Sequence, residues 1–264
     1  MDNDALRQKY NPDGSNLRNH QLRMLDILIT VDKICKEHHL TYWIASGTLL
    51  GAVRHGGFIP WDDDLDIEMP TADFKKFLQV VPAALPKHLA IQTHQTDRGY
   101  VAPYAKVRDL NSEIQENEYQ DVNYKYKGIY IDVFPMGHCS MALSGFSSKY
   151  PHYYLYKFTR KKFTGKLDYF LLHSYYTLLQ VVYGGFSLID KLMGIKYINY
   201  VYGSGFWSEF PSTCIYPLSE IEFEGHSFPC PHDQKEYLTI IYGDYMSLPP
   251  ENDRMTHTLK VVMK

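Results

Sequence analysis

The first hydrophobic pattern of the chain lies between residues 17 and 39. Apolar side chains recur there at spacings of four, three and four, as one face of a helix requires: Met24, Leu28, Val31 and Cys35. The pattern predicts an amphipathic helix over residues 17–39. The preceding residues 1–16 are polar and show no such period, so we expect a loose leader there.

Two later segments alternate polar and apolar residues, which is typical of a strand with one face in the core. Between residues 64 and 69, Asp64, Asp66 and Glu68 fall on one face, and apolar residues fall on the other. Between residues 128 and 134, Asp132 shares the polar face in the same way. We therefore expect two strands, each presenting carboxylates on its polar side.

The segments around these strands complete a mixed pattern. We expect a strand at 41–45, a short helix opened by Ser46-Gly47, a loop at 56–60, a helix with Thr71 as N-cap running to about residue 85, and shorter strands near 89–94 and 100–109. Beyond residue 140 the sequence is aromatic and mostly helical in pattern, with a hairpin at 221–231 and a helix at 232–246.

This order of elements predicts an α/β (α+β) fold in which a mixed sheet is flanked by helices. We divide the chain into a catalytic core at residues 17–139 and an aromatic, mostly helical C-terminal part at 140–264 that packs on the core. Together the two parts form a single domain.

One stretch, from Tyr169 to Ile189, has no charged residue. Its length would span a bilayer, but its polar residues and its Gly184-Gly185 pair make it a poor spanning helix. Six basic residues stand between Lys149 and Lys166. Two interpretations stay open, namely a buried helix behind a solvated basic face and a peripheral contact with a membrane or a lipid-linked acceptor.

Composition narrows the class of protein. The formal net charge of −3 over 264 residues provides no global field that would attract nucleic acid. The four cysteines lack CxxC spacing, which argues against a zinc site, and their wide separation does not indicate a disulfide framework. The N-terminus has no apolar signal core. We expect a cytoplasmic protein with reduced thiols that, if it contacts the membrane, does so at its inner face.

Chemistry concentrates in the run Asp62-Asp63-Asp64-Leu65-Asp66. Four carboxylates within five residues repel one another, and a divalent cation would relieve that repulsion. On a strand, Asp64 and Asp66 point to the same side with Cα atoms about 7 Å apart, close enough to share one hard cation. Mg²⁺, or Mn²⁺, suits oxygen ligands of this kind. An EF-hand is excluded because Ile67 stands where that loop needs glycine. A metal-dependent glycosyltransferase and a solvated acidic turn remain as alternatives.

The residues around this run favour phosphoryl transfer. Ser46-Gly47-Thr48 lies at a strand-to-helix turn, where backbone N–H groups attract phosphate. Asp132 supplies a third acid on a second strand. Lys106 and Arg108 share a face and could neutralise a diphosphate, although a solvated edge would show the same pattern.

Several long segments resemble the LicD-type phosphocholine transferases, a family that includes fukutin-related protein. They are YWIASGTLLGAVRHGGFIPWDDDLDIEM, GIYIDVFP, FEGHSFPCP and EYLTIIYGDYMSLPP, which together run from about residue 20 to about residue 255. The resemblance implies the nucleotidyltransferase superfold, with Asp64, Asp66 and Asp132 in the acid positions that bind metal. The order Ser46-Gly47 is the inverse of the family's usual Gly-Ser turn.

The resemblance also implies an activity. Phosphocholine, or a similar phospho-unit, would pass from CDP-choline to a hydroxyl of a surface glycopolymer such as lipopolysaccharide, teichoic acid or capsule, and CMP would be released. Ser46, Gly47 and Thr48 would hold phosphate, while Arg54, Lys106 and Arg108 would offset the charge of the leaving CMP. Trp43, Trp61 and the many tyrosines are candidates for an aromatic cage around choline, although buried aromatic residues are more often part of the core. The alternatives are nucleotidyl transfer to a small molecule or sugar, glycosyl transfer, and a non-catalytic glycan-binding member.

Overall fold

A computed structural model describes residues 3–116, 123–150, 165–254, 256 and 258–263. Its helices are α1 (Asn3–Tyr10), α2 (Asn16–Glu37), α3 (Ser46–His55), α4 (Thr71–Ala84), α5 (Met141–Lys149), α7 (Lys166–Leu192), α8 (Ser212–Ile215) and α9 (Gln234–Tyr242), with a 3₁₀ turn at Glu251–Asp253. Its strands are β1 (Trp43–Ile44), β2 (Asp66–Pro70), β3 (Leu89–Gln92), β4 (Ala105–Asp109), β5 (Ser112–Glu116), β6 (Tyr130–Gly137), β7 (Tyr197–Tyr200), β8 (Phe210–Pro211), β9 (Ser219–Phe223), β10 (His226–Cys230) and β11 (Thr258–Met263).

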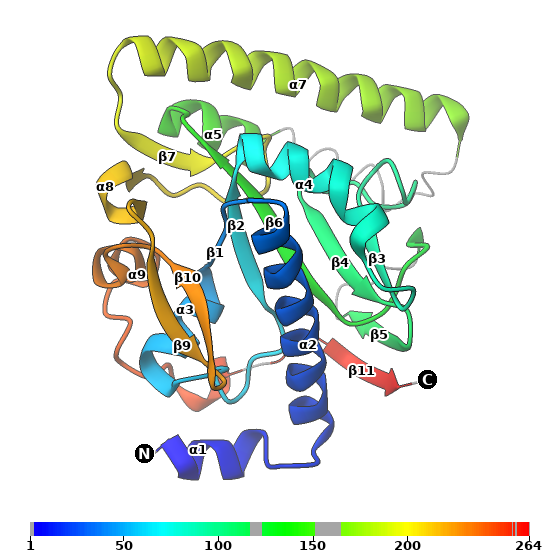
Figure 1. Ribbon diagram of the computed structural model, residues 1–264, viewed down its shortest axis with the longest axis vertical. Helices are drawn as coiled ribbons and strands as arrows, with labels where there is room; N and C mark the ends of the chain where they lie inside the picture. Colours follow the sequence, from blue (N-terminus) through cyan, green and yellow to red (C-terminus); the bar gives the residue numbers. More distant parts are fainter. Residues whose placement is uncertain (1–2, 117–122, 151–164, 255, 257, 264) are drawn as a thin grey trace.

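A mixed sheet forms the centre of the molecule (Figure 1). Its strands run in the order β1-β2-β6-β4-β3, and β7 extends it from β6 to β8. β2 and β6 are parallel, whereas β1, β4 and β7 pair with their neighbours antiparallel. The expected α/β (α+β) fold with a mixed sheet is confirmed. Because β7 pairs with β6, the sheet includes a strand from beyond residue 140.

Helices α2 and α4 lie beside the sheet and bury their apolar faces (Figure 1). The face predicted for α2 is correct, since Met24, Leu28, Val31 and Cys35 are all buried. Ser15 caps this helix by accepting a hydrogen bond from Arg18 N. The predicted N-cap of α4 is wrong, because Thr71 is the first helical residue and its hydroxyl donates instead to the Met136 carbonyl of β6.

The leader expected at residues 1–16 is wrong. The structure has helix α1 there, and Leu6 on this helix is 1% exposed. Lys9 forms an ion pair with Glu251, and the side-chain oxygen of Asn3 is hydrogen-bonded to Nδ1 of His55. Burial of one apolar side chain and two contacts with residues distant in sequence hold this segment in place. None of these features produces a periodic pattern in so short a stretch.

Strand boundaries also differ from the prediction. β2 begins at Asp66, not at residue 64, and β4 begins at Ala105, not at residue 100. The alternation nevertheless continues ahead of β2, since Asp63 and Leu65 are buried while Asp62 and Asp64 are partly exposed. The predicted hairpin is confirmed by β9 and β10, and the predicted helix after it by α9. The C-terminal β11 pairs with β5, a pairing that the sequence pattern did not predict.

Helix α7 carries the uncharged stretch and lies along one outer edge of the molecule, beside α5 and β7 (Figure 1). Leu172, Tyr176 and Tyr183 are buried, but Leu178 and Val181 are 60% and 68% exposed. The interpretation of this stretch as a buried helix is therefore wrong. No helix among the described residues is long and apolar enough to cross a membrane. Of the six basic residues noted above, Lys157, Arg160, Lys161 and Lys162 lie outside the described residues.

Candidate active site

One cleft brings together four of the nine predicted site residues. It has a volume of 560 Å³, and Ser46, Gly47, Asp64 and Asp66 all line it. Asp62, which sequence reasoning did not single out as a site residue, lines it as well. The signal for Asp62 was present in the alternation, because it lies two residues before Asp64 on the same side of the chain.

The turn into α3 approaches these carboxylates closely. A Cβ atom at Gly47 would lie 3.0 Å from Asp62 Oδ2 and 3.9 Å from Asp64 Oδ1, so glycine lets the helix start pack against the acids. Ser46 adopts a left-handed backbone with φ of 47°, which non-glycine residues rarely do. Its N–H donates to Tyr237 Oη, and its hydroxyl lies 3.5 Å from Tyr200 Oη. The first residue of α3 is thus held in place by two tyrosines.

Repulsion and burial together perturb the acids. Burial, and then the neighbouring Asp64, raise the pKa of Asp62 well above its usual range. The pKa of Asp66 is also well above its usual range, first because of burial and then because of Asp64 and Asp132. Carboxylates in this state gain free energy from a nearby cation, because the cation stabilises their ionised form.

Asp132 lies beside Asp66. The two are partners in the parallel register of β2 and β6, so their side chains share one face of the sheet. Lys106 is the register partner of Asp132 on the other side, and its ammonium lies 2.8 Å and 2.9 Å from the two carboxylate oxygens. Burial raises the pKa of Asp132, and Lys106 opposes that effect. Asp132 and Lys106 are nearly buried and are not among the residues that line the cleft.

The other predicted phosphate-binding residues lie elsewhere. The Thr48 hydroxyl accepts a hydrogen bond from Asp66 N and so positions the first residue of β2. The guanidinium of Arg108 is fully buried, where it donates to Gln92 and to the Gly128 carbonyl. Arg54 donates to the carbonyls of Tyr245 and Ser247. The structure does not place Thr48, Arg54 or Arg108 along the cleft.

Glu68 is a carboxylate on the same face whose oxygens are hydrogen-bonded by donors of the protein itself. It is fully buried and accepts hydrogen bonds from Trp43 Nε1 at 2.7 Å, Tyr200 Oη at 2.6 Å and Tyr237 Oη at 2.8 Å. Of the three carboxylates that alternation places on one face, Glu68 is therefore fully hydrogen-bonded by protein donors, whereas Asp64 and Asp66 border the cleft.

The carboxylate oxygens of Asp64 and Asp66 are ligand atoms of the kind that Mg²⁺ or Mn²⁺ binds. Such an ion commonly takes one or two carboxylates and completes its shell with water and substrate phosphate, which the Asp64–Asp66 pair could provide for. Within the described residues, no group of three acidic, histidine or cysteine side chains is already arranged around a metal position. A two-carboxylate site that is completed by the donor diphosphate is consistent with both observations.

Aromatic side chains form about half of the remaining cleft wall: Phe134, Tyr200, Phe206, Trp207 and Tyr242. The rings of Phe134 and Phe206 lie 5.5 Å apart edge to face, and those of Tyr200 and Phe206 lie 5.8 Å apart. The two tryptophans proposed from the sequence do not contribute. Trp43 is buried against Glu68, and Trp61 packs on Tyr10.

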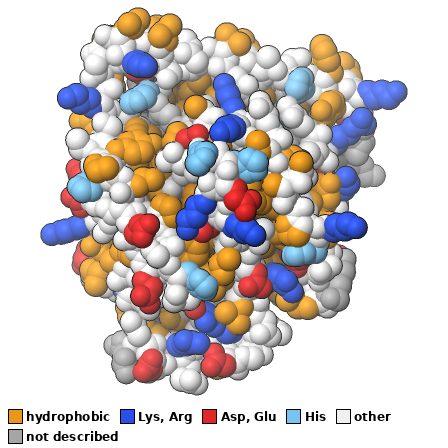
Figure 2. All heavy atoms as spheres, in the orientation of Figure 1, with side chains coloured by type: hydrophobic (Ala, Val, Ile, Leu, Met, Phe, Trp, Pro, Cys, Tyr) orange, Lys and Arg blue, Asp and Glu red, His pale blue; other side chains and the backbone are white. Residues whose placement is uncertain are grey.

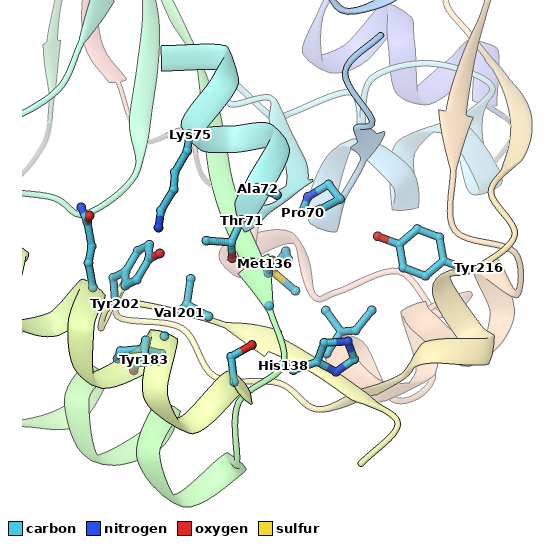
Figure 3. A pocket seen from close by; sticks show the side chains of 15 residues that line it. Pro70, Thr71, Ala72, Lys75, Met136, His138, Tyr183, Val201, Tyr202 and Tyr216 are labelled. Carbon is cyan, nitrogen blue, oxygen red and sulfur yellow. Dashed lines mark hydrogen bonds between the residues drawn. The ribbon is translucent and has the colours of Figure 1, made fainter. Parts of the chain in front are cut away.

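A second cavity of 460 Å³ lies between the start of α4, the end of β6 and α7 (Figure 3). Thr71 and Lys75 border it from α4, and Tyr183 and Tyr202 border it from the opposite side. None of the acidic residues of the first cleft lines it. Asp62, Asp64 and Asp66 therefore border the first cleft and not this second cavity.

Comparison with known proteins decides the family. Residues 39–177 match the family model described as LicD/FKTN/FKRP, nucleotidyltransferase domain. The lipopolysaccharide cholinephosphotransferase LicD of Haemophilus influenzae is 30% identical over 261 residues, which cover 92% of this chain and 96% of that protein. The chain belongs to the LicD family.

Two further relatives match over shorter segments. The human ribitol 5-phosphate transferase FKRP is 62% identical over 26 residues, which are 10% of this chain and 5% of that protein. Mannosyltransferase regulator 4 of Saccharomyces cerevisiae is 27% identical over 119 residues, which are 43% of this chain and 10% of that protein. These relatives are named for different roles, so the role of this chain has to be argued from its own cleft.

Proposed function

We propose that this LicD-family protein is a transferase that moves phosphocholine from CDP-choline to a hydroxyl of a cell-surface glycopolymer and releases CMP. The observation that carries the proposal is one cleft in which the carboxylates of Asp62, Asp64 and Asp66 face an aromatic wall. The full-length similarity to a lipopolysaccharide cholinephosphotransferase supports it.

In this proposal Asp64 and Asp66 hold Mg²⁺ or Mn²⁺, and Asp132 either completes the metal site or accepts the proton of the acceptor hydroxyl. The metal, when bound, supplies positive charge to the donor diphosphate. The chain itself contributes positioning, because Thr48 fixes the backbone of Asp66 and Gly47 lets the start of α3 approach the acids. Lys106 favours the ionised form of Asp132, in which Asp132 can take a proton or bind a cation.

The bond changes follow from this arrangement. The hydroxyl oxygen of the acceptor attacks the phosphorus that carries choline, and the bond from that phosphorus to the CMP oxygen breaks. N–H groups at the start of α3 favour the phosphate oxygens through the positive end of the helix dipole. Ser46 and Gly47 are the part of the predicted phosphate-binding turn that lines the cleft together with the acids.

The aromatic wall would bind the trimethylammonium group. A quaternary ammonium is attracted to the faces of aromatic rings by about 0.5–2 kcal/mol per good contact. Phe206 and Trp207 are 52% and 47% exposed, so their rings are available to a ligand in the cleft. Phe206 is also anchored, because its carbonyl accepts a hydrogen bond from the Ser148 hydroxyl of α5.

The acceptor would be a hydroxyl of lipopolysaccharide, teichoic acid or capsule, presented on a lipid-linked glycan at the inner face of the membrane. The named activity of the Haemophilus influenzae relative favours lipopolysaccharide. We expect the protein to work in the cytoplasm, where CDP-linked donors are made.

Donor specificity tests this proposal. Phe206→Leu removes an aromatic face but little volume, so KM for CDP-choline should rise about threefold to thirtyfold, in keeping with one cation–π contact. KM for a CDP-alditol donor without a cation should change much less. Phe146→Leu is a matched control, since Phe146 is similarly exposed on α5 but does not line the cleft. Equal effects on both donors would contradict choline binding by this wall.

A further inference from the structure

The outward face of α7 is mostly apolar and is interrupted by the exposed Ser174. Its inward side packs on the protein through Leu172, Tyr176 and Tyr183, and the Tyr176 hydroxyl donates to the Val101 carbonyl. The opposite side exposes large apolar residues that are between 54% and 79% accessible: Phe170, Leu171, Leu178, Val181, Leu188 and Leu192. At 3.6 residues per turn these six fall within an arc of about 100°, centred opposite the buried side. We call this arc the outward face of α7.

A helix that is apolar on both sides is normally covered on both sides. Monomeric soluble proteins rarely expose a continuous apolar patch of this length without a binding role. Hydrophobic side chains stand along the upper edge of the molecule, where α7 lies (Figure 2). The outward face is therefore a docking surface, and the charges around it indicate the partner.

Lysines mark both ends of the outward face. Lys166 begins the helix and Lys191 precedes its last residue, and both are exposed. The acids of the helix are engaged or hidden, because Asp168 accepts a hydrogen bond from Gly165 N and Asp190 is 4% exposed. The face thus presents an apolar strip whose ends carry positive charge.

This charge pattern disfavours a second copy of the chain. In an antiparallel pair of outward faces, Lys166 of one copy would lie near Lys191 of the other, and a parallel pair would bring identical lysines together. Like charges meet in either arrangement. In a bilayer with anionic headgroups, the acyl chains would cover the apolar strip and the headgroups would attract the lysines at both ends. The half-buried Tyr175, on one flank of this face, suits the boundary between headgroups and acyl chains.

We propose that the outward face of α7 docks on an anionic lipid bilayer, with the helix lying in the plane of the interface. The inference rests on α7 alone and not on the transfer chemistry of the cleft. Its physical consequence is that the enzyme meets membrane-borne molecules on a surface, while the catalytic cleft stays formed by α3, β2 and the loop after β7.

Vesicle flotation tests the proposal with the full chain. Wild-type protein should float with phosphatidylglycerol–phosphatidylethanolamine vesicles. The double variant Leu178→Glu/Val181→Glu should lose at least tenfold in partitioning, because two side chains that would enter the bilayer become charged. Both positions are exposed, so the variant should melt like the wild type. Leu22→Glu is the matched control, since Leu22 is an exposed leucine on α2.

A second variant tests the charges separately. Lys166→Gln/Lys191→Gln should weaken flotation with anionic vesicles at low salt and should leave the weaker binding to phosphatidylcholine vesicles unchanged. Equal flotation of the wild type and the Leu178→Glu/Val181→Glu variant, or no flotation of either, overturns the proposal. So does a dimer in sedimentation velocity that the glutamate variant abolishes while the wild type binds no vesicle. Transferase activity on a short soluble acceptor should be unaffected by either variant, so failure of the membrane proposal can be told from failure of the proposed function.

Discussion

Replacement of Glu68 by glutamine should destabilise the protein severely, although the change removes only a charge. The carboxylate of Glu68 is fully buried and accepts three hydrogen bonds, two at Oε1 and one at Oε2. A glutamine amide keeps one acceptor oxygen and places a donor where the Trp43 N–H or the tyrosine hydroxyls point. At least one buried donor then lacks an acceptor, which costs about 1–3 kcal/mol, and the remaining bonds lose roughly 1 kcal/mol each with the charge.

The expected loss is thus about 3 kcal/mol or more, a large part of the 5–15 kcal/mol typical of a folded domain. For a chain of this size it corresponds to a fall of about 6–12 °C in Tm. Urea unfolding followed by far-UV circular dichroism measures it. Glu222→Gln is the matched control, because Glu222 is exposed on β9.

The same experiment separates structural from catalytic carboxylates. The Glu68 network holds Tyr237 and Tyr200, which in turn contact Ser46 at the start of α3. Loss of stability in Glu68→Gln is therefore expected together with a loosened cleft. A change below about 0.5 kcal/mol would refute the assignment of Glu68 as a donor-satisfied structural group.

Three further outcomes are expected. Asp64→Asn or Asp66→Asn should abolish turnover while Tm stays unchanged or rises, because removal of one carboxylate relieves repulsion but weakens the metal site; near-normal activity at saturating Mg²⁺ would contradict this. Mg²⁺ or Mn²⁺ should raise Tm, and more so with CDP-choline, by about 2.7 kcal/mol of stability at a hundredfold excess over Kd, whereas a flat Tm across the titration would leave the metal site unsupported. Burial lowers the pKa of His20 to about 4. Between pH 6.5 and 4, His20 therefore binds a proton in the unfolded chain but stays unprotonated in the native state. Stability should fall by about 2 kcal/mol from this residue over that window, and urea titrations of His20→Gln at pH 7 and pH 4.5 should show a smaller fall.

The sequence pattern predicted the parts of the fold that repeat locally. The helical face of α2, the alternation around Asp64 and Asp66, and the β9–β10 hairpin each depend on spacing within one segment, so they could be predicted. The pairing of β11 with β5 and the docking of α1 depend on contacts between distant residues, which local spacing does not encode. Strand ends were misplaced because pairing, and not alternation, decides where a strand begins.

The candidate site was predicted in part for the same reason. The acids of one face were identified by alternation, and β2–β6 pairing then placed Asp66 beside Asp132. The roles suggested for Lys106, Arg108 and Arg54 followed from charge alone, which does not reveal that the nearest partners are Asp132, Gln92 and backbone carbonyls. Of the aromatic residues that the sequence suggested for a cage, the tyrosines contribute through Tyr200 and Tyr242, whereas the two tryptophans do not. Phe134 and Phe206 were missed because they come from separate segments.

The central claim is that the Asp64–Asp66 cleft transfers a phospho-unit from a CDP-linked donor. Identification of the nucleotide released, with CDP-choline, nucleoside triphosphates and sugar nucleotides each supplied with Mg²⁺ and an acceptor glycan, tests it most directly, and Asp66→Asn serves as the blank. The account predicts CMP from CDP-choline in the wild type and none in the variant. Pyrophosphate from a nucleoside triphosphate, UDP or GDP from a sugar donor, or no nucleotide from any donor would contradict it, and these results would indicate a nucleotidyltransferase, a glycosyltransferase and a non-catalytic glycan-binding protein, respectively.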